Sequence, residues 1–110
     1  MARDEAVRLS WYVAAGASPK GTLECVQAWL TDFRKDLERI DVPVLVIHGD
    51  DDRILPIAAT GKRTAGMVAG SRLVVIKGGP HGLNWTHAEE VNHELLDFLG
   101  EKKSETRKAA

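Results

Sequence analysis

Two short apolar runs, rich in β-branched residues, constrain this chain more than any other feature. The first spans residues 42–47 (VPVLVI) and the second spans residues 72–76 (RLVVI). Neither run alternates apolar with polar residues, and unbroken apolarity is typical of parallel strands that are covered on both faces. A helical pattern lies between them, over about residues 57–68. The sequence therefore predicts an α/β domain that binds ligands near the carboxyl ends of its strands.

Helical patterns also flank this unit on both sides. We expect three helices before it: one over residues 4–15, one beginning at Pro19 with Ser18 as N-cap, and a short one over residues 32–40. In the second helix an inner apolar face is expected, made of Leu23, Val26, Trp29 and Leu30. The last helix is expected to start at the capping box formed by Thr86 and Glu89.

The predicted fold class is thus α/β, with three N-terminal helices followed by a β-α-β-α segment that contains two parallel strands. We expect the helices in residues 1–41, the α/β segment in residues 42–100 and a polar tail, frayed at the end, in residues 101–110.

Composition excludes several classes of protein. Of the 110 residues, 44% are hydrophobic and 28% are charged, which is typical of a folded chain, and the net charge of −1 provides no basic face for nucleic acid. No apolar run approaches the roughly 20 residues that span a bilayer, and the first ten residues lack the apolar core of a secretory signal. A single cysteine, Cys25, excludes an internal disulfide. We therefore expect a cytoplasmic protein that binds neither nucleic acid nor membrane.

Groups suited to acid–base chemistry follow both predicted strands. Three carboxylates, Asp50, Asp51 and Asp52, come after the first strand, and His81 comes after the second. Loops that follow neighbouring parallel strands can meet, since the strands lie about 5 Å apart. A histidine general base works best when a carboxylate orients its other ring nitrogen. In α/β-hydrolases the triad follows the chain order serine, acid, histidine, and this chain supplies the second and third in that order.

Longer motifs extend this pattern over residues 4–100. The segments GASPK (16–20), TDFR (31–34), VPVLVIHGDDDRILP (42–56) and SRLVVIKGGPHGLNWTHAEEVNHELLDFL (71–99) together resemble the non-haem haloperoxidases, α/β-hydrolases that are also described as arylesterases or perhydrolases. HGDxDRxxP and PHGL at this spacing are specific as a pair, whereas either motif alone is weak.

The resemblance implies roles for particular residues. Asp52 would be the triad acid and His81 the base, and the substrate would be a small ester or carboxylate. Apart from the resemblance, Trp85 is expected to touch the substrate pocket, because it lies four residues after His81. The three N-terminal helices would be the end of a cap over the active site, and the two strands would be the last two of an eight-stranded sheet. The chemistry would require no metal and no cofactor.

The expected nucleophile is missing from these 110 residues. The serines are Ser10, Ser18, Ser71 and Ser104, and none lies in a G-x-S-x-G elbow. Roughly the first three-fifths of the family's usual length would lie upstream. We therefore expect a segment of a serine hydrolase that is inactive alone. The alternative is a non-catalytic interaction piece whose open strand edge pairs with another copy or with a separately encoded N-terminal half.

Other polar residues near the two motifs are given structural roles. We expect Asp50 and Asp51 to belong to a solvated turn, with Asp50 bracing it through backbone amides. His48, at a strand end, is expected to hydrogen-bond across loops. The set His48, Asp50, Asp52 and His81 could in principle bind a divalent ion, but the chain contains no H-x-x-x-H or C-x-x-C spacing, and we expect no metal.

Overall fold

The computed structural model describes the backbone of residues 2–108 and the side chains of residues 4–100. The chain divides into two compact units, one ending at Phe33 and the other beginning at Arg34, and each is described by itself. Among the described helices, none combines the length and the apolar character needed to cross a membrane.

The first unit contains two helices, α1 (Ala2–Ala15) and α2 (Pro19–Ala28). The predicted start of α2 is confirmed, because the amide of Gly21 donates to the Ser18 hydroxyl over 3.2 Å and Pro19 is the first helical residue. The predicted inner face of α2 is wrong. The side chains predicted to line it are exposed, Leu23 to 61% and Leu30, which follows the helix, to 88%, so the described part of this unit does not cover them.

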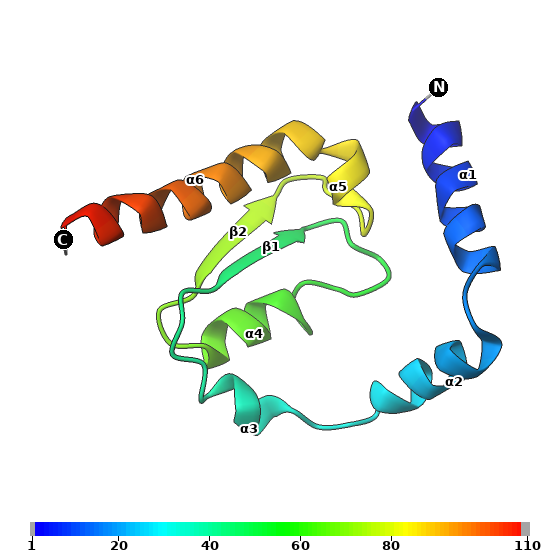
Figure 1. The fold of residues 1–110 in the computed structure, drawn as a ribbon, viewed down its shortest axis with the longest axis horizontal. Coiled ribbons are helices and arrows are strands. Elements are labelled where there is room, and N and C mark those ends of the chain that lie inside the picture. The colour runs from blue at the N-terminus through cyan, green and yellow to red at the C-terminus, as the bar shows by residue number, and fades with distance from the viewer. Residues whose placement is uncertain (1, 109–110) are drawn as a thin grey trace. The chain divides into compact units, whose positions relative to one another are not determined.

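The second unit is built around two parallel strands (Figure 1). Its elements are α3 (Arg34–Leu37), β1 (Leu45–Gly49), α4 (Gly61–Met67), β2 (Arg72–Ile76), α5 (Leu83–Thr86) and α6 (Ala88–Lys108). β1 and β2 pair in register from Leu45 with Arg72 to Gly49 with Ile76. The predicted fold class, helices followed by a parallel β-α-β unit, is therefore confirmed.

Several predicted boundaries shift for local reasons. β1 begins at Leu45 rather than at residue 42, because pairing starts where the amide of Arg72 donates to the Val44 carbonyl, 2.9 Å away. α3 is four residues long, shorter than the predicted range 32–40. Residues 57–60 form turns instead of the first turn of α4, with the amide of Ala59 donating to the Pro56 carbonyl.

The predicted capping box of the last helix is also wrong. Thr86 is the last residue of α5, and its hydroxyl lies 2.8 Å from Nδ1 of His87. The short helix α5 therefore takes the residue that the pattern assigned to the N-cap of α6. At its other end, α6 continues to Lys108, through residues that were expected to fray.

The apolar core of the second unit is small. Among the described residues, the buried hydrophobic side chains are Val68, Ile76 and Val91. In Figure 1 the strands lie between α4 and α6, and the ion pair of Arg72 with Glu94 ties β2 to α6. The strands are mostly half-buried, and Val75 is exposed, so the expectation of strands covered on both faces holds only in part. One helix on each side is too little to cover them.

The loops that follow β1 and β2 lie directly against each other. A Cβ placed on Gly49 would overlap the carbonyl oxygen of Gly79, so the two backbones approach as closely as glycine allows. Two hydrogen bonds join the same loops: the amide of Asp51 donates to the Gly79 carbonyl over 3.2 Å, and the amide of Gly78 donates to Oδ1 of Asp50 over 2.6 Å. This contact brings together the segments that carry Asp52 and His81.

We predict that Gly49→Ala destabilises the fold by about 1–3 kcal/mol, because the added methyl group forces the two loops apart. Gly66→Ala is the matched control. Gly66 lies in α4, and a methyl group there would meet nothing within 4 Å beyond the adjacent residues and backbone of its own helix, so the variant should be more stable by about 0.5–1 kcal/mol. Urea denaturation measures both. Equal stability of the Gly49 variant and the parent chain would contradict the close approach.

Candidate active site

Asp52 lies in the turn after β1 and is only 8% exposed. Its Oδ1 accepts hydrogen bonds from the amides of Ile54 and Leu55, each over 2.9 Å. Its Oδ2 lies 2.9 Å from Nδ1 of His81, which follows β2. The structure thus brings together the two residues that the sequence paired, at a distance typical of a hydrogen bond.

The hydrogen bond fixes which nitrogen of His81 carries a proton. A carboxylate oxygen only accepts at neutral pH, so Nδ1 is the donor. In the neutral ring Nε2 is then unprotonated, which is the state a general base requires. The His81 side chain is 47% exposed, while the Asp52 side chain is almost fully enclosed. The pair therefore presents an accessible imidazole on a buried acid.

Opposing effects act on the charge of Asp52. Burial raises the pKa of its carboxyl group. The hydrogen bond from His81 and the two backbone amides favour the ionised form more strongly, and the pKa falls from 3.8 to about 2. Asp52 is consequently a carboxylate throughout the neutral range, ready to stabilise an imidazolium at His81.

The neighbouring polar residues have the structural roles that the sequence predicted. Asp50 braces the loops by accepting from the Gly78 amide, and Asp51 is exposed, with Oδ1 3.1 Å from Nε of Arg53. His48 hydrogen-bonds through Nε2 to the Leu55 carbonyl over 2.9 Å. Sequence reasoning missed one contact: Nε2 of His48 also lies 3.2 Å from Oδ2 of Asp52. The sequence signal for this contact was the spacing of four residues between His48 and Asp52 in the HGDDD motif.

The serines whose side chains are described have other partners or positions. Ser18 caps α2, and the hydroxyl of Ser71 donates to the Ala65 carbonyl over 2.9 Å. Ser71 precedes β2, at the opposite end of that strand from His81. Ser10 lies in α1, and the side chain of Ser104 lies outside the described residues. Among the described side chains, no group of three or more histidines, cysteines or acids is placed to hold a metal ion.

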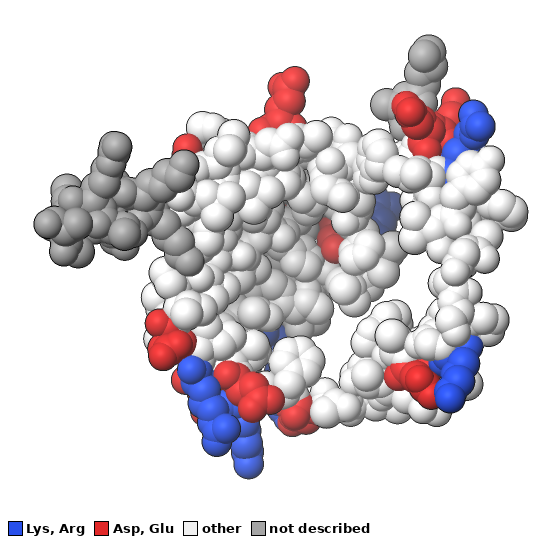
Figure 2. Space-filling view, viewed as in Figure 1, with Lys and Arg blue, Asp and Glu red and all other residues white. Residues whose placement is uncertain are grey.

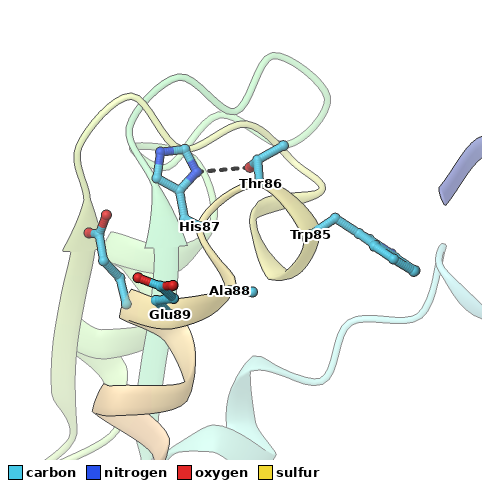
Figure 3. Close-up of a pocket in the computed structure, with 6 residues that line it drawn as sticks. Trp85, Thr86, His87, Ala88 and Glu89 are labelled. Carbon is cyan, nitrogen blue, oxygen red and sulfur yellow. Dashed lines mark hydrogen bonds between the residues drawn. The ribbon is translucent and has the colours of Figure 1, made fainter. Parts of the chain in front are cut away.

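A pocket of about 350 Å³ lies at the junction of α5 and α6 (Figure 3). It is lined by Trp85, Thr86, His87, Ala88, Glu89 and Glu90. In Figure 3 the ring of Trp85 extends away from His87 and Glu89. Neither Asp52 nor His81 lines this pocket, so the predicted contact of Trp85 with substrate stays a prediction.

Comparison with known proteins identifies the family. Residues 4–88 match the family model of the α/β hydrolase fold. A protein of Synechocystis sp. that carries the name of the non-haem chloroperoxidases is 62% identical over 87% of this chain. The chain belongs to the α/β-hydrolase family, in its non-haem haloperoxidase branch.

Other relatives agree in sequence and in structure. A crystal structure of a bromoperoxidase from Bacillus anthracis is 55% identical, covers 87% of the chain and superimposes with a TM-score of 0.80. A bifunctional esterase/perhydrolase of Acinetobacter calcoaceticus is 44% identical over 63% of the chain. The chain covers 35% of the Synechocystis relative, 25% of the Acinetobacter relative and 36% of the bromoperoxidase chain. It is thus a C-terminal segment of the haloperoxidase fold.

The lowered pKa of Asp52 predicts how stability depends on pH. The folded pKa of about 2 lies below the ordinary value of 3.8, so the ionised carboxylate stabilises the fold fully above the ordinary value. That contribution should be lost as pH falls from 3.8 to about 2. Carbon NMR of the Asp52 carboxyl group should give a titration midpoint of about 2. Urea denaturation at a series of pH values should show the free energy of unfolding falling over the same range.

Two variants separate this effect from general acid denaturation. Asp52→Asn should flatten the pH dependence of stability in this window, whereas Asp51→Asn, on the exposed side of the same turn, should preserve it. A titration midpoint near 3.8 for Asp52 would show that the hydrogen bonds from His81, Ile54 and Leu55 do not stabilise the carboxylate in solution.

Proposed function

We propose that this segment supplies the acid and the base of a serine esterase or perhydrolase, with Asp52 and His81 in these roles. The observation that carries the proposal is the 2.9 Å hydrogen bond from His81 to the buried carboxyl group of Asp52. The names of the relatives support the reaction class, since one is a bifunctional esterase/perhydrolase and another is a bromoperoxidase. The substrate class that fits this chemistry is a small ester or carboxylate.

The proposed reaction is acyl transfer, with the serine supplied from outside these 110 residues. As the serine oxygen attacks the ester carbonyl, Nε2 of His81 takes its proton, and Asp52 stabilises the resulting imidazolium. His81 then gives the proton to the departing alcohol as the acyl-enzyme forms. Water, activated by the same imidazole, attacks the acyl-enzyme and releases the acid. Hydrogen peroxide in place of water would release a peracid, which can oxidise a halide ion.

Elements around the acid–base pair have proposed roles in the complete protein. The helices α1, α2 and α3 would be the end of a cap over the active site. Trp85 would line the substrate pocket, because α5 directly follows the loop that carries His81 and the Trp85 side chain is half exposed. The cytoplasmic location expected from the composition also stays a prediction.

A chimera tests the proposed roles. Here the chain replaces the matching part of the Synechocystis relative, to which it is 62% identical. The chimera should hydrolyse p-nitrophenyl acetate, and His81→Ala and Asp52→Asn should each lower kcat by about 10³–10⁴. His93→Ala is the matched control, because His93 is an exposed residue of α6 that should leave kcat unchanged.

The 110-residue chain by itself gives the baseline. It should show no saturable turnover above free imidazole and no labelling by a fluorophosphonate probe, because it lacks a serine in a nucleophile elbow. A folded but inactive chimera, or full activity after His81→Ala, would contradict the proposed function. Labelling of the chain alone would reveal a nucleophile within it.

A second candidate function is self-association, and the surface of the first unit favours it. Its large exposed apolar side chains are Val7, Leu9, Trp11, Tyr12, Val13, Leu23, Val26, Trp29, Leu30 and Phe33. The described charged side chains of α1 are Asp4, Glu5 and Arg8, in its first half, and residues 9–15 are uncharged, so much of this helix is white in Figure 2. Extended apolar surface of this kind usually marks an interaction site. A second copy of the chain, or a separately encoded N-terminal half, would cover it.

We expect the chain to form a dimer or larger assembly at micromolar concentration, measured by light scattering. Val26→Glu should shift it toward the monomer, because it places a charge on the apolar face of α2. Gln27→Glu introduces the same side chain at the next exposed position and should change the assembly less. A monodisperse monomer of 12.0 kDa in the parent chain would contradict self-association.

A further inference from the structure

His48 is a nearly buried histidine to which the proposed reaction assigns no role. It lies in β1 immediately before Gly49, and its side chain is 12% exposed. Nε2 is 2.9 Å from the carbonyl oxygen of Leu55. A carbonyl oxygen only accepts, so Nε2 of His48 carries the proton and donates it to Leu55.

The peptide groups of Leu55 connect His48 to Asp52. While the carbonyl of Leu55 accepts from His48, its amide donates to Oδ1 of Asp52 over 2.9 Å. His48 therefore fixes the carbonyl group of Leu55, while the amide group of the same residue binds the carboxylate of Asp52. In addition, Nε2 of His48 lies 3.2 Å from Oδ2 of Asp52, the oxygen that accepts from His81. The ring of His48 thus lies directly against the oxygen that must stay fixed.

The ring of His48 is itself held in place by α4. A Cβ on Gly61, the first residue of α4, would lie 2.7 Å from Nδ1 of His48 and 3.1 Å from its Cγ. The helix backbone thus packs directly against the imidazole, and the absence of a side chain at Gly61 makes room for it. A ring confined in this way can hold the Leu55 carbonyl in a fixed direction.

We propose that His48 is a positioning residue for the acid–base pair: it acts through Leu55 to hold Oδ2 of Asp52 on Nδ1 of His81. The inference rests on the proposed function for the roles of Asp52 and His81. A histidine that only filled space in the fold would contribute to stability but would not affect the alignment of this pair.

Three variants distinguish positioning from packing. His48→Phe retains the ring volume but removes the donor. His48→Gln retains an N–H donor that can reach the Leu55 carbonyl. Gly61→Ala keeps the histidine but displaces its ring, and it remains informative if His48→Phe does not fold.

In the chimera, His48→Phe and Gly61→Ala should lower kcat by about 10- to 100-fold with little change in KM, because a misplaced base slows chemistry rather than binding. His48→Gln should restore kcat to within a few-fold of the parent. Wild-type kcat in the Phe variant, or an equal loss in the Gln variant, would overturn the inference.

Nitrogen NMR of the 110-residue chain gives a second readout that needs no activity. In the parent, the Nδ1 proton of His81 should be visible and slow to exchange. In His48→Phe it should exchange faster and the two ring nitrogens should approach tautomeric averaging, while His48→Gln should resemble the parent. An unchanged His81 spectrum in His48→Phe would overturn the positioning role. An inactive parent chimera would instead overturn the proposed function, and the NMR comparison would still decide the role of His48.

Discussion

The parallel pairing of β1 with β2 is the constraint on which the candidate site depends. Because both strands run in the same direction and end in register at Gly49 and Ile76, the loops that follow them emerge side by side. Gly49 and Gly79 then let the backbones of the two loops come into direct contact. An antiparallel arrangement would place Asp52 and His81 at opposite ends of the sheet. The meeting of Asp52 with His81 is therefore a consequence of strand direction and of two glycines.

Burial of Asp52 is tolerated because both of its oxygens are satisfied. A buried carboxylate without partners would become protonated, since burial raises its pKa. Here two backbone amides donate hydrogen bonds to Oδ1, and the imidazole of His81 donates one to Oδ2. Together these bonds outweigh the effect of burial, so the ionised form of Asp52 is favoured. The same hydrogen bonds that keep the charge also fix its direction. The charge and the orientation of Asp52 therefore both depend on the same three hydrogen bonds, two from the turn at residues 52–55 and one from His81.

The sequence predicted the two strands, their direction and the meeting of Asp52 with His81, because apolar runs and loop motifs are encoded locally. The packing of α2 could not be predicted in the same way: Leu23 and Val26 form an apolar face, but a sequence pattern does not state what covers it. Likewise the Thr86-x-x-Glu89 pattern fits a capping box at the start of α6, but in the structure Thr86 is the last residue of the short helix α5. The contact of His48 with Asp52 required a three-dimensional turn that no periodicity describes.

The hydrogen bonds that Asp52 accepts come from Ile54, Leu55 and His81, all within the second unit. The rotational freedom of the imidazole is thus already reduced when this unit folds, before a nucleophile or an ester arrives. In the proposed reaction, a segment that supplies the serine would only have to bring one oxygen to an imidazole whose orientation is already set. Alignment of the imidazole and delivery of the nucleophile would then be separable tasks, carried by different stretches of polypeptide.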